Sequence, residues 1–153
     1  MQKIKELATE FRVAIVNAKN DRRFTADQCF WNFPSGCCGI TSELLAKFLM
    51  DNGIKGELVY IGGTYRDYSQ ELPSHAWLEL EDNIVVDITG DQFKYCSSPL
   101  NFNETVYVGP YNGFYNIFDI DEKEICNNYY PLNDVYIRNH LSRKNCMKLY
   151  LNI

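Results

Sequence analysis

Three side chains of types that can carry out acyl transfer follow one another along the chain: a cysteine, a histidine and an aspartate. Cys38 lies in FPSGCCGITSELLAKFL, His75 in SHAWLEL and Asp87 in IVVDIT. Thiol-dependent acyl transfer uses a cysteine as nucleophile, a histidine as base and a carboxylate that orients the histidine. Because the chain has only two histidines, finding one of them in this order is informative. We therefore predict a catalytic triad of Cys38, His75 and Asp87.

The predicted chemistry depends on Cys38 lying at the start of a helix. A thiol at neutral pH is mostly protonated, and only the thiolate attacks a carbonyl carbon efficiently. The free N–H groups and positive dipole end of a first helical turn stabilise a thiolate. His75 would pair with that thiolate and later protonate the leaving group, while Asp87 would hold the imidazole tautomer. The expected reaction passes through a thioester on Cys38, without a metal or an organic cofactor.

Neighbouring residues compete for roles in this site. Cys37 is an alternative nucleophile, and Asp91 is an alternative orienting acid, although only Asp87 is expected within a paired strand. The backbone N–H of Cys38 would be the first oxyanion donor. The second donor is left open among upstream candidates: Gln28, Trp31 and Asn32.

Both tryptophans are candidates for substrate contact. Trp77 shares the predicted face of His75, where it would wall a substrate groove or shield the imidazole, and plain packing is the alternative. Trp31 lies in the aromatic segment that leads to Cys38. Gln92 is a site neighbour by proximity in the sequence alone, and His140 is expected to be structural or exposed.

The segment from Ser74 to Thr89 predicts a hairpin whose register brings His75 and Asp87 together. A three-residue turn, Glu81-Asp82-Asn83, pairs Leu80 with Ile84. One face of the hairpin then becomes entirely apolar: Ala76, Leu78, Leu80, Ile84, Val86 and Ile88. The other face carries His75, Trp77, Glu79, Val85, Asp87 and Thr89. Since a two-residue turn would mix the two faces, the hydrophobic pattern favours the three-residue turn.

The remaining elements are predicted from hydrophobic spacing. Helices are expected over residues 2–17 and from Cys38 to about Asn52, and strands over 57–61 and 104–108. The polar segment 64–73 is expected to be a flexible loop, and a further helix is expected after Pro131. These elements predict a single α+β domain over residues 1–153, with an antiparallel sheet packed against the helix that carries Cys38.

Composition excludes several classes of function. The net charge of −5 argues against a nucleic-acid partner, and the C-terminal basic residues read as a solvated helix face. No apolar stretch is long enough to cross a bilayer, and the N-terminus lacks the pattern of a signal peptide, so a cytoplasmic protein is expected. The six cysteines are scattered without zinc-site spacing, which favours reduced thiols over disulfides.

The motifs around the three side chains resemble the transglutaminase-like cysteine-catalysis superfamily, which belongs to the papain-like fold. The matching pieces are Gly36-Cys37-Cys38 before a helix, the strand around His75-Ala76-Trp77, and Val86-Asp87-Ile88. The resemblance spans about residues 31–93 and implies Cys38, His75 and Asp87 as the triad. The hairpin is shorter than is usual in that superfamily, so the architecture of the substrate site does not transfer. Its members include peptidases, amidases, transglutaminases, acyltransferases and inactive proteins.

Three functions are therefore predicted in order of preference. The first is a cysteine-dependent hydrolase of a peptide or amide substrate, with acyl transfer to an amine as its variant. The second is an inactive binding module of the same fold, whose partner surface would use aromatic residues such as Tyr111, Tyr115, Tyr129 and Tyr130. The core is an equal alternative for these rings. The third is a redox-sensing pair formed by Cys37 and Cys38.

Overall fold

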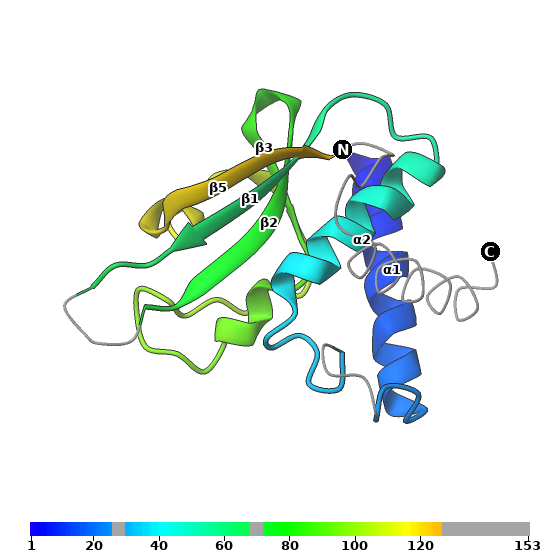
Figure 1. Cartoon of the computed structure of the whole chain (residues 1–153), viewed down its shortest axis with the longest axis horizontal. Helices are drawn as coiled ribbons and strands as arrows, with labels where there is room; N and C mark the ends of the chain where they lie inside the picture. Colours follow the sequence, from blue (N-terminus) through cyan, green and yellow to red (C-terminus); the bar gives the residue numbers. More distant parts are fainter. Residues whose placement is uncertain (26–29, 68–71, 127–153) are drawn as a thin grey trace, which may run out of the picture.

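The computed structural model describes residues 1–25, 30–67 and 72–126, and these residues form an α+β fold. Helices α1 (Gln2–Asn20) and α2 (Cys38–Asp51) precede a five-stranded antiparallel sheet (Figure 1). The strands are β1 (Leu58–Thr64), β2 (Ser74–Leu80), β3 (Ile84–Asp87), β4 (Tyr107–Pro110) and β5 (Asp119–Cys126). Their order across the sheet is β4-β3-β2-β1-β5. The predicted α+β class is confirmed at this level.

Both helices pack against the same face of the sheet and enclose the larger apolar core. Phe11 and Ile15 of α1 and Leu45 and Leu49 of α2 are buried, in line with the predicted helical spacing. They contact Leu78 and other sheet residues in one continuous cluster. Burying these apolar stripes supplies the main stabilisation of both helices. The predicted helix 2–17 is confirmed and continues to Asn20, and the predicted second helix is confirmed from Cys38.

The hairpin of β2 and β3 has the predicted register. Leu80 pairs with Ile84 across the three-residue turn, and Leu78 pairs with Val86. Asp82 and Asn83 adopt left-handed backbone angles, with φ of 62° and 57°. This turn therefore needs two left-handed residues, where the sequence predicted one at Asn83. Acidic and amide side chains tolerate that conformation better than most.

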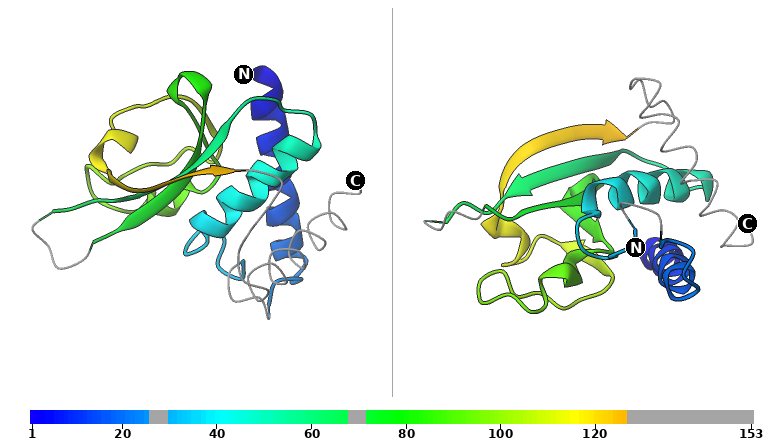
Figure 2. Two further views of the ribbon diagram at one scale, coloured as in Figure 1. Left: turned by 45° about the horizontal axis from the view of Figure 1, so that its top comes forward. Right: turned by 60° about the horizontal axis from the view of Figure 1, so that its bottom comes forward.

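A second, aromatic core covers the opposite face of the sheet. The two faces and their different coverings are seen in the left view of Figure 2, with the helices on one side. Trp77 and Val85 point to this second core, whereas Leu78 and Val86 point to the helices. The chain that follows β3 supplies its remaining members, including Phe93, Phe114, Tyr115 and Phe118. The sheet is thus a middle layer between helices and an aromatic cover.

Two strand predictions differ from the structure. The strand expected over 104–108 begins only at Tyr107 and runs to Pro110. The strand expected to end at Ile61 continues through Gly62 and Gly63 to Thr64, with a register shift between the two glycines against β5. A Cβ on Gly63 would lie 2.9 Å from the Phe118 Cβ, so the glycine allows that ring to pack against the sheet.

Strand β5 was not predicted, because its sequence DIDEKEIC alternates charges instead of burying one face. It is an edge strand with seven of its eight residues exposed. The helix expected after Pro131 and the residue His140 lie outside the described residues. Within the described residues, no helix is both long and apolar enough to span a membrane.

Candidate active site

The hairpin brings His75 and Asp87 into direct contact. The Nε2 atom of His75 lies 2.7 Å from Oδ2 of Asp87, and both side chains are buried. The two residues start β2 and end β3, so the three-residue turn and the strand pairing fix their relative position. A buried histidine whose Nε2–H bonds a carboxylate keeps Nδ1 free to exchange a proton.

Asp87 accepts hydrogen bonds from four donors. Besides His75, its oxygens accept from the backbone N–H of Thr89 at 2.8 Å, the Thr89 hydroxyl at 3.1 Å and the Tyr115 hydroxyl at 2.9 Å. Burial alone would raise the pKa of Asp87. The charge of His75 and these hydrogen bonds outweigh burial and lower the pKa, so the carboxylate stays ionised.

Cys38 is the first residue of α2, and its thiol forms a hydrogen bond with His75. Burial alone would raise the pKa of Cys38, but the hydrogen bond and charge of His75 lower it below its ordinary value. Burial alone would lower the pKa of His75, but Asp87, with help from Cys38, raises it to about 9. These opposite shifts favour a thiolate and an imidazolium at neutral pH.

Helix α2 is held so that Cys38, and not Cys37, faces the imidazole. The Ser42 hydroxyl, one turn along the helix, donates to the backbone oxygen of Ala76 at 3.3 Å. Cys37 is buried among the apolar residues of the larger core, and its sulfur contacts the Pro34 carbonyl at 3.6 Å. The structure therefore brings Cys38, His75 and Asp87 together, and it turns Cys37 away from them.

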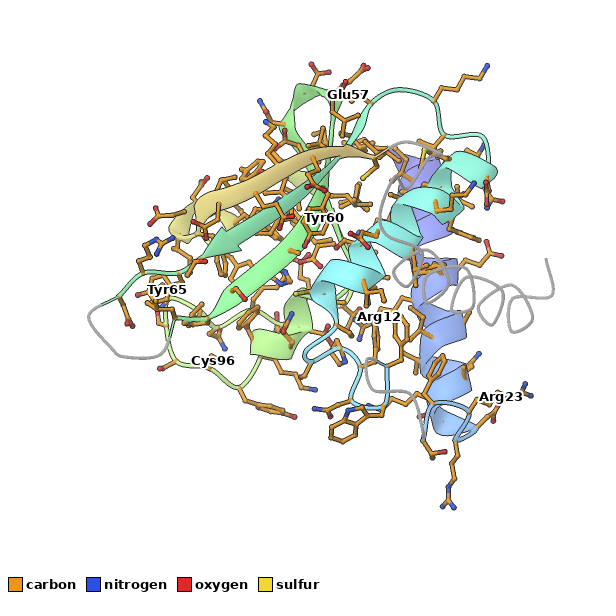
Figure 3. The ribbon with its side chains drawn as sticks, in the orientation of Figure 1. Arg12, Arg23, Glu57, Tyr60, Tyr65 and Cys96 are labelled. Carbon is orange, nitrogen blue, oxygen red and sulfur yellow. The ribbon has the colours of Figure 1, made fainter. Side chains whose placement is uncertain are left out.

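Asp91, the alternative orienting acid, has a different partner. Both of its oxygens accept hydrogen bonds at 2.8 Å from the Arg12 guanidinium, which also donates to the Ile88 carbonyl. Figure 3 labels Arg12 between α1 and the segment that leads into α2. Asp91 thus joins the first helix to the turn that follows β3, and Asp87 is the carboxylate at His75.

An open pocket of about 190 Å³ lies beside the thiol. Its lining comes from the start of α2, the ends of β1 and β2, and β5: Cys38, Tyr60, Gly62, Gly63, Thr64, Ser74, His75, Ala76, Asp121 and Glu122. Tyr60, labelled in Figure 3 between β1 and α2, brings its hydroxyl close to Gly39, where an added Cβ would lie 3.0 Å from it. A small acyl group has room next to Cys38.

Neither tryptophan lines this pocket. Trp77 has an exposed fraction of 0% and donates from Nε1 to the Tyr111 hydroxyl at 3.2 Å. Of the alternatives for Trp77, packing in the aromatic core beside the His75 ring describes its surroundings in the structure, and a contact with substrate stays a prediction. Trp31 is 59% exposed but is not among the residues that line the pocket. Its contact with substrate therefore stays a prediction.

Two site neighbours were missed or underrated from the sequence. Tyr115, which the sequence assigns equally to a partner surface or to the core, is completely buried and bonds Asp87. No local pattern links it to the hairpin, because it lies 28 residues beyond Asp87. Gln92 was named only for its nearness in sequence, and its amide nitrogen lies 3.1 Å from Nδ1 of His75.

No protein-family model, no curated protein and no solved structure matches the chain. Among the described residues, Cys38, Cys96 and Cys126 have free thiols. Among residues 1–25, 30–67 and 72–126, no three histidine, cysteine or acidic side chains are grouped as metal ligands.

Proposed function

We propose that this protein is a cysteine-dependent hydrolase of amide or peptide bonds, with Cys38 as nucleophile, His75 as acid and base, and Asp87 as orienting carboxylate. One observation carries the proposal. A buried imidazole bonds a buried carboxylate through one nitrogen and the thiol of Cys38 beside an open pocket. Structural histidines seldom combine these features, and perturbed pKa values in a pocket are typical of catalytic groups.

The first half of the reaction forms a thioester. The sulfur of Cys38 attacks the carbonyl carbon, and the π electron pair moves onto oxygen to give a tetrahedral intermediate. As the intermediate collapses, the carbonyl reforms and the C–N bond breaks, while Nδ1–H of His75 protonates the departing nitrogen. Asp87 remains ionised and stabilises the imidazolium until this proton leaves.

The second half returns the enzyme to its starting state. Neutral His75 takes a proton from water, and the resulting hydroxide equivalent attacks the thioester carbon. Collapse breaks the C–S bond, releases a carboxylic acid and leaves the thiolate paired with the imidazolium again. An amine in place of water would give a new amide by the same steps. We keep hydrolysis as the proposal because water needs no further binding site.

The same geometry supports the proposed kinship with papain-like and transglutaminase-like proteins. A helix starting at the cysteine packs on an antiparallel sheet whose neighbouring strands carry the histidine and the aspartate. Apart from Cys38 and His75 themselves, the charged residues among the described pocket lining are Asp121 and Glu122, and Arg66 pairs with Asp121. Near the thiol the pocket therefore favours an uncharged or cationic substrate group over an anionic one. The free thiol of Cys38 fits the predicted cytoplasmic location, because the cytosol keeps thiols reduced.

Alkylation with iodoacetamide tests whether Cys38 is activated. We expect Cys38 to be modified at least about tenfold faster than exposed Cys96 at slightly acidic pH, as located by peptide mass spectrometry. His75→Ala should remove most of this advantage, whereas Cys37→Ser should keep it. Equal rates at Cys38 and Cys96 would contradict the proposal, and hydrolysis of p-nitrophenyl acetate that survives Cys38→Ala would contradict it as well.

A further inference from the structure

Gln92 presents an amide N–H to Nδ1 of His75, the ring nitrogen that Asp87 does not bond. Its Nε2 lies 3.1 Å from Nδ1 of His75 and 3.2 Å from the backbone oxygen of Thr89. The Thr89 carbonyl can only accept, so it fixes which end of the amide is nitrogen. One N–H of Gln92 is therefore committed to Thr89, and the other points to the reacting groups.

The turn that carries Gln92 is held rigidly on both sides. The preceding residue, Asp91, forms the paired hydrogen bonds with Arg12. The following residue, Phe93, is buried and packs edge-on against the His75 ring, with ring centres 5.2 Å apart. Gln92 itself is partly exposed and contacts the catalytic imidazole, but it is not among the residues that line the pocket beside Cys38. A donor held this way loses little entropy when a substrate arrives.

The ion pair of His75 and Cys38, formed before the attack, leaves this donor without its acceptor. With neutral His75, the Nδ1 lone pair accepts from Gln92. In the ion pair Nδ1 carries the proton and can no longer accept, so the N–H of Gln92 loses that acceptor. When sulfur attacks, the carbonyl oxygen becomes negative close to the same group. A strong new acceptor then replaces the lost one.

We infer that Gln92 is the side-chain oxyanion donor of this site and acts together with the backbone N–H of Cys38. This inference rests on the proposed function. Of the upstream candidates, Trp31 and Asn32 are exposed, and neither they nor Gln92 are among the residues that line the pocket, while Gln28 lies outside the described residues. What distinguishes Gln92 is its contact with Nδ1 of His75, and on this inference the donor comes from the turn after the aspartate strand.

Two reactions of Cys38 separate this role from simple positioning of His75. Acylation by p-nitrophenyl acetate passes through a tetrahedral oxyanion, whereas alkylation by iodoacetamide displaces iodide from a saturated carbon and forms none. In Gln92→Met, which keeps the side-chain length without the donor, we expect acylation to fall roughly 100-fold while alkylation changes less than about threefold. Gln2→Met, on the exposed surface of α1, is the matched control and should change neither rate.

Gln92→Glu provides a second variant, should the methionine variant fail to fold. A carboxylate cannot donate to an oxyanion but stabilises the imidazolium, so acylation should fall while alkylation is maintained or accelerated. Parallel loss of both reactions would overturn the inference and make Gln92 a positioning residue, and unchanged acylation would overturn it too. A wild-type Cys38 slow in both reactions would instead refute the proposed function, and the inference with it.

Discussion

At the scale of single residues, the most demanding feature of this protein is the buried charge of Asp87. A carboxylate removed from water is costly unless hydrogen bonds and an opposite charge compensate. Here four donors and the imidazolium of His75 provide that compensation. Burial and the negative charge of Asp87 raise the pKa of Tyr115, so its hydroxyl stays protonated and always donates. Tyr115 therefore maintains the state of Asp87 on which His75 depends.

Removing the Tyr115 hydroxyl tests this dependence. Tyr115→Phe keeps the buried ring and deletes only the donor to Asp87. We expect a loss of about 2 kcal/mol in the free energy of unfolding, the usual size for a hydrogen bond to a buried charge. The Cys38 alkylation rate should fall as well, because Asp87 supports the imidazolium less well. Tyr111→Phe is the control, since Tyr111 bonds Trp77 and Glu79 instead. Because Tyr111 also donates to a buried carboxylate, that of Glu79, the two variants are compared by alkylation rate, and equal falls in that rate would contradict the prediction.

The raised pKa of His75 predicts how stability depends on pH. Cys38→Ala removes the titration of the thiol and leaves Asp87 as the main cause that raises the pKa of His75. A group whose pKa is higher in the folded state stabilises the fold below its ordinary pKa, here 6.5, and loses that contribution as pH rises toward about 9. Urea unfolding of this variant should show a decline of about 1–3 kcal/mol over that interval. If the double variant Cys38→Ala/Asp87→Asn shows an equally steep decline of stability with pH, the decline does not come from the effect of Asp87 on the pKa of His75.

At the scale of elements, the ion pair of Arg12 and Asp91 joins α1 to the turn behind the site. The Arg12 guanidinium also stacks over the Phe33 ring at 5.1 Å from its centroid, so one side chain of α1 links two loops beside Cys38. Helix α1 contains no residue of the candidate triad, and we infer that it contributes to the site by fixing these loops.

Substitution of Arg12 measures that contribution. Arg12→Met leaves Asp91 buried without its partner, and we expect a loss of about 3 kcal/mol in the free energy of unfolding. The acylation rate should also fall, because the turn with Gln92 loses its anchor. Lys47→Ala, which breaks an ion pair within α2, should cost about 0.5 kcal/mol and leave acylation intact. If Arg12→Met keeps the wild-type acylation rate, the turn with Gln92 does not need the ion pair of Arg12 and Asp91, and the prediction is wrong.

Elements with strong hydrophobic spacing were predictable, and elements defined by distant partners were not. The pattern of Leu80 and Ile84 determined the hairpin register, and with it the contact of His75 with Asp87. Strand β5 and the bond of Tyr115 to Asp87 depend on long-range pairing that leaves no periodic trace in the local sequence. The ion pair of Arg12 and Asp91 joins residues 79 positions apart, so no local pattern predicts it.

At the scale of the whole molecule, one sheet separates two different cores. Aliphatic residues and helices fill one side, and aromatic rings fill the other. Since strands β2 and β3 contribute alternate residues to both cores, neither core can be lost without disrupting the other. Asp87 and Tyr115 lie on the aromatic side, and Cys38 belongs to a helix of the aliphatic side. The candidate site forms at the end of the sheet where the two layers meet.

This arrangement predicts a single cooperative unfolding transition. Trp31→Phe leaves buried Trp77 as the sole tryptophan reporter of the aromatic core, while far-ultraviolet circular dichroism reports largely on the helices. In that background, Leu45→Ala and Ile61→Ala, one in each core, should each cost about 3 kcal/mol. Both optical signals should shift together in both variants. Fluorescence and dichroism transitions that separate in either variant would show that the cores unfold independently.

The turn at 81–83 also determines which changes in chain length the molecule tolerates. Adding or deleting one residue there would invert the alternation along β3 and turn residue 87 toward the helices, away from the imidazole. The connection between α2 and β1, at 52–57, contributes no side chain to the pocket and can vary in length without moving the acid. Length variation should therefore be well tolerated before the sheet begins and poorly tolerated within its central hairpin.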